Sequence, residues 1–377
     1  MTQSSIELHS ISEAIEAIKK GEVIIVVDDA DRENEGDFVA AAETITPEMI
    51  NFMATHGRGL ICTPLTEERC KELQLGKMVS NNTDPMETAF TVSVALKGNG
   101  VTTGISASDR ALTVKALVEA NTKPHELSRP GNFFPLIAKS GGVLRRTGHT
   151  EAAIDFARLA GFNPAGVIVE IMNEDGTMAR RPELEKFAEE HDLKIGTIAD
   201  LIHYRVINER TIEKVSEGKV NTDHGEFTLH TYKDLLAGDI HHALVKGTIN
   251  KDEATLVRVH LASSIRDLLG TQPGDSPSWN IQRCIKKVVE EGSGVIVLLA
   301  HDEHPEETLA SVDIAMGKKP APVAVADGSS NAYLTIGLGS QIVRDVGVSK
   351  LRLMGPPIKY NAISGFDLEI VDFILPE

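Results

Sequence analysis

The strongest local signal in the first half of the chain is EVIIVVDDADRENEGD, at residues 22–37. After the opening glutamate, residues 23–27 are all β-branched, which predicts a buried strand. The next ten residues carry six carboxylates and one arginine. Ligands of open α/β sheets bind just beyond the carboxyl ends of the strands. This charged run therefore stands where a ligand site is expected.

The acidic run at residues 28–37 has two interpretations. Most charge runs are solvated faces of a protein. At a strand end, however, crowded carboxylates repel one another unless a cation holds them, and Mg²⁺ suits a site with few protein ligands and several waters. Arg32 either binds a substrate anion or neutralises the loop. Because of the position of the run, we favour a metal and substrate site.

Further along the chain, strands and helices alternate. Buried strands are predicted at residues 59–63 and 166–172, and helical spacing of apolar residues recurs at residues 11–18. The pattern predicts an α/β (α+β) domain. A highly charged, apolar-poor segment follows at residues 208–219 and indicates a domain boundary. We expect a first domain at residues 1–208, a linker at 209–218 and a second domain at 219–377.

Composition restricts the classes of function. The 377 residues correspond to about 2.5 average domains. A net charge of −17 and an aromatic content of 4% do not suit binding to nucleic acid or to anionic membranes. No apolar run approaches the ~20 residues of a membrane helix. Three scattered cysteines, and a first segment without an apolar leader region, favour the cytoplasm.

A second motif, RRTGHT at residues 145–150, follows the pair Gly141 and Gly142. Thr150 is a plausible N-cap for a helix over residues 151–160. A helix N-terminus flanked by arginine and glycine is either an ordinary capped helix with surface arginines or an anion site. A single histidine such as His149 is usually packed or solvated, but its place beside a phosphate-type site favours a functional role.

Five blocks of the first half together resemble the 3,4-dihydroxy-2-butanone 4-phosphate synthase family. The resemblance runs in consistent order over about residues 8–208. The blocks are DRENEGD (31–37), GVTTGISASDR (100–110), RPGNFFPL (129–136), RRTGHTEAAIDFARLAG (145–161) and PAGVIVEIMNEDGTMAR (164–180). The resemblance implies a mixed-sheet α/β domain that converts D-ribulose 5-phosphate to L-3,4-dihydroxy-2-butanone 4-phosphate and formate in riboflavin biosynthesis.

The family resemblance also implies roles for single residues. Glu33 and His149 would ligate Mg²⁺ or Mn²⁺, and Glu170 would be the essential acid/base. The implied substrate contacts are Arg32, Glu33, Asp37, Arg146, Thr147, Gly148, His149, Thr150 and Glu170. Cys62 lies where the family has a cysteine near the site, although a small buried hydrophobe is an equally good interpretation. The resemblance further implies a homodimer.

Two positions depart from the family pattern. Ala30 replaces an acid in the acidic run, and Asn132 replaces a histidine that the family treats as essential. An asparagine cannot accept a proton near neutral pH. Loss of a general acid or base costs ~10²–10⁴-fold in rate. Three interpretations remain open, namely a slow enzyme, an enzyme with a relocated base, or an engineered or degenerate copy, and we favour synthase chemistry.

Residues 219–377 resemble a GTP cyclohydrolase II domain, again of the α/β class. The blocks are VRVH (257–260), EEGSGVIVLL (290–299) and YLTIGLGSQIVRDVGVSKLRLM (333–354). The three zinc cysteines of that family are missing, because Ser263 stands near the first position and Cys284 is alone. HDEHPEE (301–307) replaces an arginine-bearing block. We expect neither zinc nor cyclohydrolase activity, and we expect Gly337 and Gly339 to form a turn before a helix at residues 340–346.

Three hypotheses follow for the whole chain. The leading one is a Mg²⁺-dependent carbon–carbon lyase with a degenerate second domain. A catalytically impaired protein that binds a sugar phosphate, or that serves in assembly or regulation, is the alternative that Asn132 keeps open. A bifunctional enzyme that also acts as GTP cyclohydrolase II conflicts with the missing cysteines.

Overall fold

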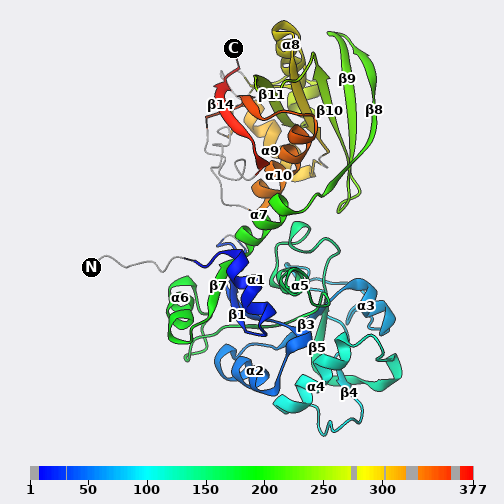
Figure 1. Ribbon diagram of the computed structural model, residues 1–377, viewed down its shortest axis with the longest axis vertical. Coiled ribbons are helices and arrows are strands. Elements are labelled where there is room, and N and C mark those ends of the chain that lie inside the picture. Colours follow the sequence, from blue (N-terminus) through cyan, green and yellow to red (C-terminus); the bar gives the residue numbers. More distant parts are fainter. Residues whose placement is uncertain are drawn as a thin grey trace, which may run out of the picture. The chain divides into compact units, whose positions relative to one another are not determined.

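The computed structural model describes residues 8–30, 32–272, 278–300, 303–319, 330–357 and 366–376 (Figure 1). The chain forms two compact units, Met1–Tyr204 and Arg205–Glu377. Asp31 of the acidic run and His301 of the second half lie outside the described residues. Within the described part, no helix is both long enough and apolar enough to cross a membrane.

The first unit is built on a seven-stranded mixed sheet with the order β4-β5-β3-β6-β2-β1-β7. Its strands are β1 (Ile24–Val27), β2 (Gly36–Ala41), β3 (Cys62–Leu65), β4 (Val94–Leu96), β5 (Leu127–Ile137), β6 (Gly166–Glu170) and β7 (Lys194–Thr197). Its helices are α1 (Ile11–Lys19), α2 (Pro47–Phe52), α3 (Glu67–Glu72), α4 (Ala107–Val118), α5 (His149–Leu159) and α6 (Arg181–Glu190). Helix α7 (Ile198–Asn208) runs across the boundary between the units.

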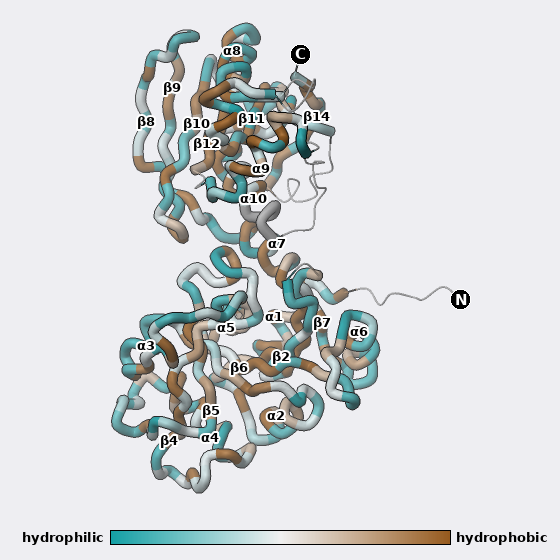
Figure 2. Tube along the Cα trace, turned by 180° about the vertical axis from the view of Figure 1, so that it is seen from behind, coloured by the Kyte–Doolittle hydropathy of each residue, from teal (hydrophilic) through white to brown (hydrophobic). Residues whose placement is uncertain are grey.

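Alternation along the strands divides the side chains between two faces of this sheet. On one face, Ile25, Phe38 and Val169 enter a core that includes residues of α2, α4 and α6. On the other face, α5 packs on β2, β3 and β6 and also contacts α1. In Figure 2 the hydrophobic colour follows β2 and β6, whereas α6 is mostly hydrophilic. The strand predicted at residues 23–27 is confirmed as β1, and all four of its residues are buried.

The second unit has its own seven-stranded mixed sheet, with the order β14-β13-β11-β12-β10-β9-β8. Its strands are β8 (Ile212–Thr222), β9 (Gly225–Asp234), β10 (Ile240–Lys246), β11 (Ala254–Leu261), β12 (Gly294–Leu299), β13 (Lys350–Met354) and β14 (Glu369–Ile374). Its helices are α8 (Ile281–Glu291), α9 (Pro305–Ala315) and α10 (Ser330–Asp345). Cys284, Ile285 and Val288 of α8 pack into a core with strand residues such as Leu244, Leu256 and Ile296.

The segment expected to be a linker differs from that expectation. Residues 212–218 lie in β8, which pairs with β9 in an antiparallel hairpin. Most of β8 is exposed, so it forms without the apolar residues that usually mark a strand in sequence. The compact units divide between Tyr204 and Arg205, inside α7.

The expected turn at Gly337 and Gly339 is wrong, because both glycines lie inside α10. A Cβ on Gly337 would stand 2.1 Å from Cγ1 of Val206, and one on Gly339 would stand 2.8 Å from Cγ1 of Val259. The helix therefore needs glycine at these positions for close packing, and not for a turn.

Candidate active site

The acidic loop after β1 is organised around the carboxylate of Asp28, whose side chain is fully buried. Its Oδ1 accepts a hydrogen bond from the Glu35 backbone N–H at 2.8 Å, and its Oδ2 accepts one from the Glu33 N–H at 3.1 Å. The Arg32 guanidinium donates to Asp28 Oδ2 at 2.9 Å and to Glu33 Oε2 at 2.8 Å. Asp28 thus shapes the loop that presents Glu33.

Arg180, just before α6, holds the other side of this loop. Its Nη1 donates to the Glu33 carbonyl oxygen at 2.9 Å and also to the Asn34 carbonyl oxygen. Asn34 has a φ of +56°, a left-handed conformation that asparagine tolerates better than most residues. The loop conformation therefore depends on the guanidinium group of a residue that lies 146 positions further along the chain than Asn34.

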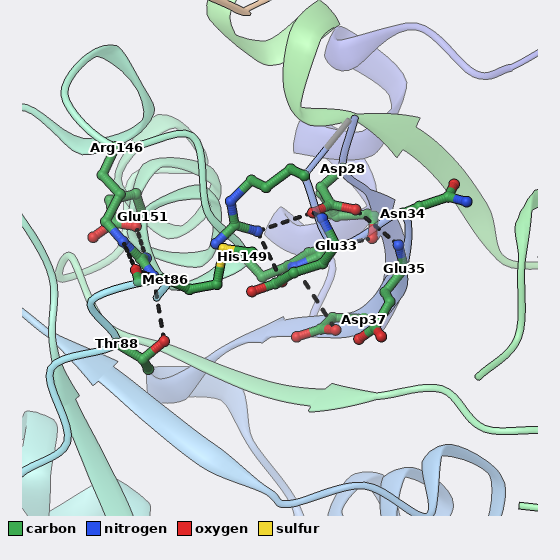
Figure 3. A network of polar contacts seen from close by, with 12 residues as sticks. Asp28, Glu33, Asn34, Glu35, Asp37, Met86, Thr88, Arg146, His149 and Glu151 are labelled. Atoms are coloured by element: carbon green, nitrogen blue, oxygen red, sulfur yellow. Dashed lines mark hydrogen bonds and ion pairs between the residues drawn. The ribbon is translucent and has the colours of Figure 1, made fainter. Parts of the chain in front are cut away.

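His149 enters the site from the first position of α5. Gly148 is the N-cap, with extended backbone at φ −108° and ψ 161°. The predicted cap, Thr150, is wrong: this residue lies in the first turn and is buried. His149 Nε2 lies 3.1 Å from the Val26 carbonyl oxygen, which can only accept, so Nε2 donates. Nδ1 faces Glu33 Oε2 at 3.7 Å and Asp37 Oδ1 at 3.8 Å (Figure 3).

Asp28, Glu33 and His149 bring one ligand atom each to a common point, with these atoms within 4.8 Å of one another. Two carboxylate oxygens and one imidazole nitrogen suit Mg²⁺ or Mn²⁺. The hydrogen bond at Nε2 fixes the histidine tautomer, as in many metal sites. The donor set of this chain therefore fits a hard divalent cation, and Asp28 joins the two predicted ligands.

The charges of the cluster favour a cation at this point. The His149 side chain, aided by Arg32, lowers the pKa of Glu33 to about 2. Burial by itself would lower the pKa of His149, but the carboxylates of Asp37, Glu33 and Asp28 raise it to about 9. Burial raises the pKa of Asp37 to about 7. The negative field of the loop thus stabilises positive charge at the imidazole.

The sheet places Glu170 beside this cluster. Glu170 ends β6 and is the register partner of Asp37 on β2, so the two side chains are cross-strand neighbours on the face covered by α5. Leu60 N–H donates to Glu170 Oε2 at 2.8 Å. Cys62 is buried nearby, and its thiol pKa is raised by burial first and then by the charges of Glu170 and Asp37. A thiol of this kind remains protonated near neutral pH.

Arg146 lies on the other side of the α5 N-terminus (Figure 3). Its Nη1 donates to the buried Glu151 Oε2 at 2.7 Å, and its Nη2 donates to the Met86 carbonyl oxygen at 2.8 Å. Burial raises the pKa of Glu151 above its usual value, against the effect of Arg146. A Cβ on Gly148 would stand 2.4 Å from Arg146 Nη1 and 3.1 Å from Arg32 Nη2. Two guanidinium groups therefore flank the N-cap glycine.

The structure brings most of the predicted site residues together. Arg32, Glu33 and Asp37 meet His149 and Arg146 around the start of α5, and Gly148, Thr147 and Thr150 belong to the same turn. Asn132 has a hydrogen-bond partner outside this group. Among the residues that the structure describes, its side chain donates to the Thr103 carbonyl oxygen, in the loop before α4.

Sequence reasoning missed Asp28 as a candidate ligand, the contact of Arg180 with the acidic loop, and the Leu60 N–H. Asp28 is the first residue after the strand, where side chains at a strand end converge. Arg180 is the last residue of the fifth motif block, but the sequence does not indicate what its side chain contacts. A backbone donor such as Leu60 N–H has no signature in sequence.

The second unit shows a different polar cluster at the position of the missing cysteines. Ser263 Oγ donates to Glu303 Oε1 at 3.1 Å, and Ser264 Oγ donates to Glu303 Oε2 at 2.5 Å. Cys284 is buried on α8 within the apolar core. In the described part of the chain, Asp28, Glu33 and His149 form the one group of three such side chains close enough to hold a metal.

A donor set for a divalent cation beside an arginine-flanked helix N-terminus defines an enzyme-type site for a phosphorylated substrate. Comparison with known proteins agrees. Residues 12–204 match the model of the family described as 3,4-dihydroxy-2-butanone 4-phosphate synthase, and residues 213–375 match that described as GTP cyclohydrolase II. The chain belongs to the 3,4-dihydroxy-2-butanone 4-phosphate synthase family and carries a second domain similar to GTP cyclohydrolase II.

Individual relatives extend over the whole chain. A Pseudomonas aeruginosa protein named 3,4-dihydroxy-2-butanone 4-phosphate synthase is 52% identical over 98% of this chain and 100% of its own. The crystal structure of RibBX, a two-domain synthase from A. baumannii, matches 98% of this chain and 100% of its own at a TM-score of 0.82 and 44% identity. A synthase in complex with two magnesium ions matches 52% of this chain and 96% of its own, at a TM-score of 0.50 and 45% identity.

These findings confirm the predicted family, the two-domain α/β class with mixed sheets, and the synthase as the enzyme class. They give no support to the alternative of an impaired protein, and they leave the activity of the second domain open in either direction.

Proposed function

We propose that the first unit converts D-ribulose 5-phosphate to L-3,4-dihydroxy-2-butanone 4-phosphate and formate. One observation carries the proposal: the donor set of Asp28, Glu33 and His149 lies at the same end of α5 as Gly148 and Arg146. A site for a divalent cation and a site for an anion thus adjoin each other. A short phosphorylated ketose carries both kinds of group, oxygens for a cation and a phosphate for the arginines.

The phosphate end is proposed at Gly148. The first N–H groups of an α-helix have no partner within the helix, and they attract anions. Arg146 and Arg32 add two guanidinium groups on either side of this glycine. Arg146 is held in place by the Met86 carbonyl oxygen and by Glu151, so its position does not depend on the ligand.

Proton transfer is proposed at the facing pair Glu170 and Asp37. The reaction removes a proton next to a ketone, rearranges the carbon skeleton and releases one carbon as formate, with no other reactant needed. Two carboxylates that face each other from neighbouring strands can serve as acid and base in turn. A divalent cation, Mg²⁺ or Mn²⁺, would supply electrostatic stabilisation of negative charge on substrate oxygens.

Formate release tests this proposal. Purified full-length protein with ribulose 5-phosphate and Mg²⁺ should release formate and the four-carbon phosphate in equal amounts, and excess chelator should stop the reaction. Glu33→Gln keeps the shape of the side chain but removes its charge, and should need far more Mg²⁺. Absence of turnover in the unmodified protein, together with absence in Asn132→His, would refute synthase activity.

We propose that the chain forms a homodimer, as its family resemblance implies.

The comparison of the unmodified protein with Asn132→His also tests the role of this departure from the family pattern. Within one chain the Asn132 side chain donates a hydrogen bond to the Thr103 carbonyl oxygen. A rate increase of more than ~10²-fold in Asn132→His would identify asparagine as a lesion, whereas an unchanged rate would show that the reaction does not need a base there.

We propose that the second unit binds no zinc and does not hydrolyse GTP. We also propose that the protein works in the cytoplasm. The support is the replacement of thiolate ligands by Ser263 and the location of Cys284 in the apolar core. Metal analysis of the purified protein should find no stoichiometric zinc. Zinc-dependent release of formate from GTP would contradict this part of the proposal.

A further inference from the structure

A short segment between α2 and β3 runs alongside the end of β6, at the point where Glu170 enters the site. The segment contains a π-helical turn, Met53–Gly57, followed by Arg58 with a left-handed φ of +69°. Gly57 carbonyl oxygen accepts from Met172 N–H at 2.9 Å, and Arg58 Nη1 donates to the Met172 carbonyl oxygen at 2.9 Å. Arg58 also forms an antiparallel bridge with Ile171. The segment is therefore fastened to the two residues that follow Glu170.

This fastening brings Gly59 into very close contact with Glu170. A Cβ on Gly59 would stand 2.4 Å from Glu170 Oε2, 2.8 Å from the Glu170 carbonyl oxygen and 2.9 Å from the Glu170 Cβ. Real Cβ atoms essentially never approach so closely. Only glycine at position 59 allows the main chain to pass directly over the Glu170 side chain.

The close approach sets one hydrogen bond. Leu60 N–H donates to Glu170 Oε2 at 2.8 Å, and the bond links residues 110 positions apart. Leu60 is 43% exposed, and its hydrogen bond to Glu170 comes from the main chain. π-helical turns and left-handed non-glycine residues both occur preferentially at functional sites. Here they end where a backbone donor meets a carboxylate.

We propose that Gly59 and Leu60 form a positioning device for Glu170: the Leu60 N–H fixes the direction of the carboxylate, and Gly59 makes the approach possible. The inference rests on the proposed role of Glu170 in proton transfer. An acid/base group must be held within a fraction of an ångström of its working position, since a misplacement of about 1 Å can cost ~10²-fold in rate. The segment acts through Glu170 and does not itself touch the reacting atoms.

Two matched pairs of variants test this device in the full-length protein. Leu60→Pro removes the donor, whereas Leu60→Ala removes the exposed side chain but keeps the N–H. Gly59→Ala places a methyl group against the Glu170 carboxylate. Gly57→Ala places one against Val169 and the Glu170 carbonyl oxygen, 2.8 and 3.1 Å away, without reaching the carboxylate. The readouts are kcat and KM for ribulose 5-phosphate at saturating Mg²⁺, with the unfolding temperature of each variant.

We expect kcat of Leu60→Pro to lie at least ~10-fold below that of Leu60→Ala, with KM values within about threefold of each other. Gly59→Ala should lose more kcat than Gly57→Ala for the same loss of unfolding temperature. If Leu60→Pro does not fold, the glycine pair decides. Equal kcat within each pair, or a kcat that follows only the unfolding temperature, would overturn the positioning role.

Glu170→Gln separates this inference from the proposed function. If Glu170→Gln is inactive and the two pairs show no difference, the proton-transfer role stands and the positioning device is refuted. If Glu170→Gln keeps the kcat of the unmodified protein, the role of Glu170 itself is refuted, and the device with it.

Discussion

The two units contain polar clusters of similar composition that are organised in opposite ways. In the first unit, Asp28, Glu33 and His149 direct ligand atoms at one point. In the second unit, Asp267 accepts from Ser263 N–H and Ile281 N–H and pairs with His260 at 3.0 Å. Despite burial, His260 and Arg266 hold the pKa of Asp267 below its usual value. Acids and histidines thus indicate a binding site only where the fold makes their ligand atoms converge.

The largest effect is expected from breaking the convergent cluster. Glu33→Gln should lower formate release at sub-saturating Mg²⁺ by more than ~100-fold, since even residues that only support a metal ligand cost 10–100-fold in metal affinity or activity. Glu303→Gln is the matched control, because it removes a carboxylate charge from the cluster of the second unit. A Mg²⁺ titration of formate release compares the two. Equal Mg²⁺ requirements for both variants would contradict the contrast between the clusters.

The phosphate side of the first cluster should give the next effect. Arg146→Ala should raise KM for ribulose 5-phosphate by about 10–100-fold, because hydrogen bonds to charged groups contribute about 1.5–3 kcal/mol. Arg145→Ala removes the same charge from the adjacent, exposed position. Steady-state kinetics of both variants checks the prediction. A similar rise in KM for both would indicate a general charge effect in place of a phosphate contact.

A substitution in the cluster of the second unit should change the stability of that unit and leave the rate of formate release unchanged. Glu303→Gln weakens its hydrogen bonds with Ser263 and Ser264. The cost is about 1–3 kcal/mol, or about 2–12 °C in unfolding temperature for a unit of this size. Calorimetry of the full chain would show whether the change in unfolding temperature belongs to the second unit. If Glu303→Gln leaves the unfolding of the second unit unchanged but abolishes formate release, the two clusters have been given the wrong roles.

An effect on stability of similar size is expected from the packing of α10, where the sequence predicted a turn. Gly337→Ala should destabilise the second unit by about 1–3 kcal/mol, because the new methyl group overlaps Val206 in a filled interior. Gly218 lies on β8 with no atom within 4 Å of an added Cβ, so Gly218→Ala should change stability by less than about 0.5 kcal/mol. Denaturant unfolding measures both. Equal effects would place Gly337 in a turn, as the sequence suggests.

Local patterns in the sequence predicted the parts of the fold that local forces determine. The β-branched residues 23–27 identified β1, and the acidic run that follows identified one wall of the site. The N-cap of α5 was predicted at Thr150 but lies at Gly148. Glycine offers no side-chain cap and so gives no signal in sequence, although its extended backbone can occupy the N-cap position. The β8 hairpin was missed because an exposed strand needs no apolar residues.

Contacts between distant segments carried no signal that a sequence reading could use. The pairing of Asp37 with Glu170 depends on the antiparallel register of β2 and β6. The clamp by Arg180 and the hydrogen bond from Leu60 N–H depend on the same sheet and on the loops at its edge. Family resemblance supplied Glu33, His149 and Glu170 as candidates, and the fold alone shows how their side chains are held.

An anomalous difference map from a crystal of the full chain soaked with Mn²⁺ would locate the bound cation. We expect anomalous density between Glu33 and His149, with Asp28 beside it, and none within the cluster of Ser263, Asp267 and Glu303. Density at the second cluster, or no density between Glu33 and His149 at a Mn²⁺ concentration that supports formate release, would refute the proposed metal site.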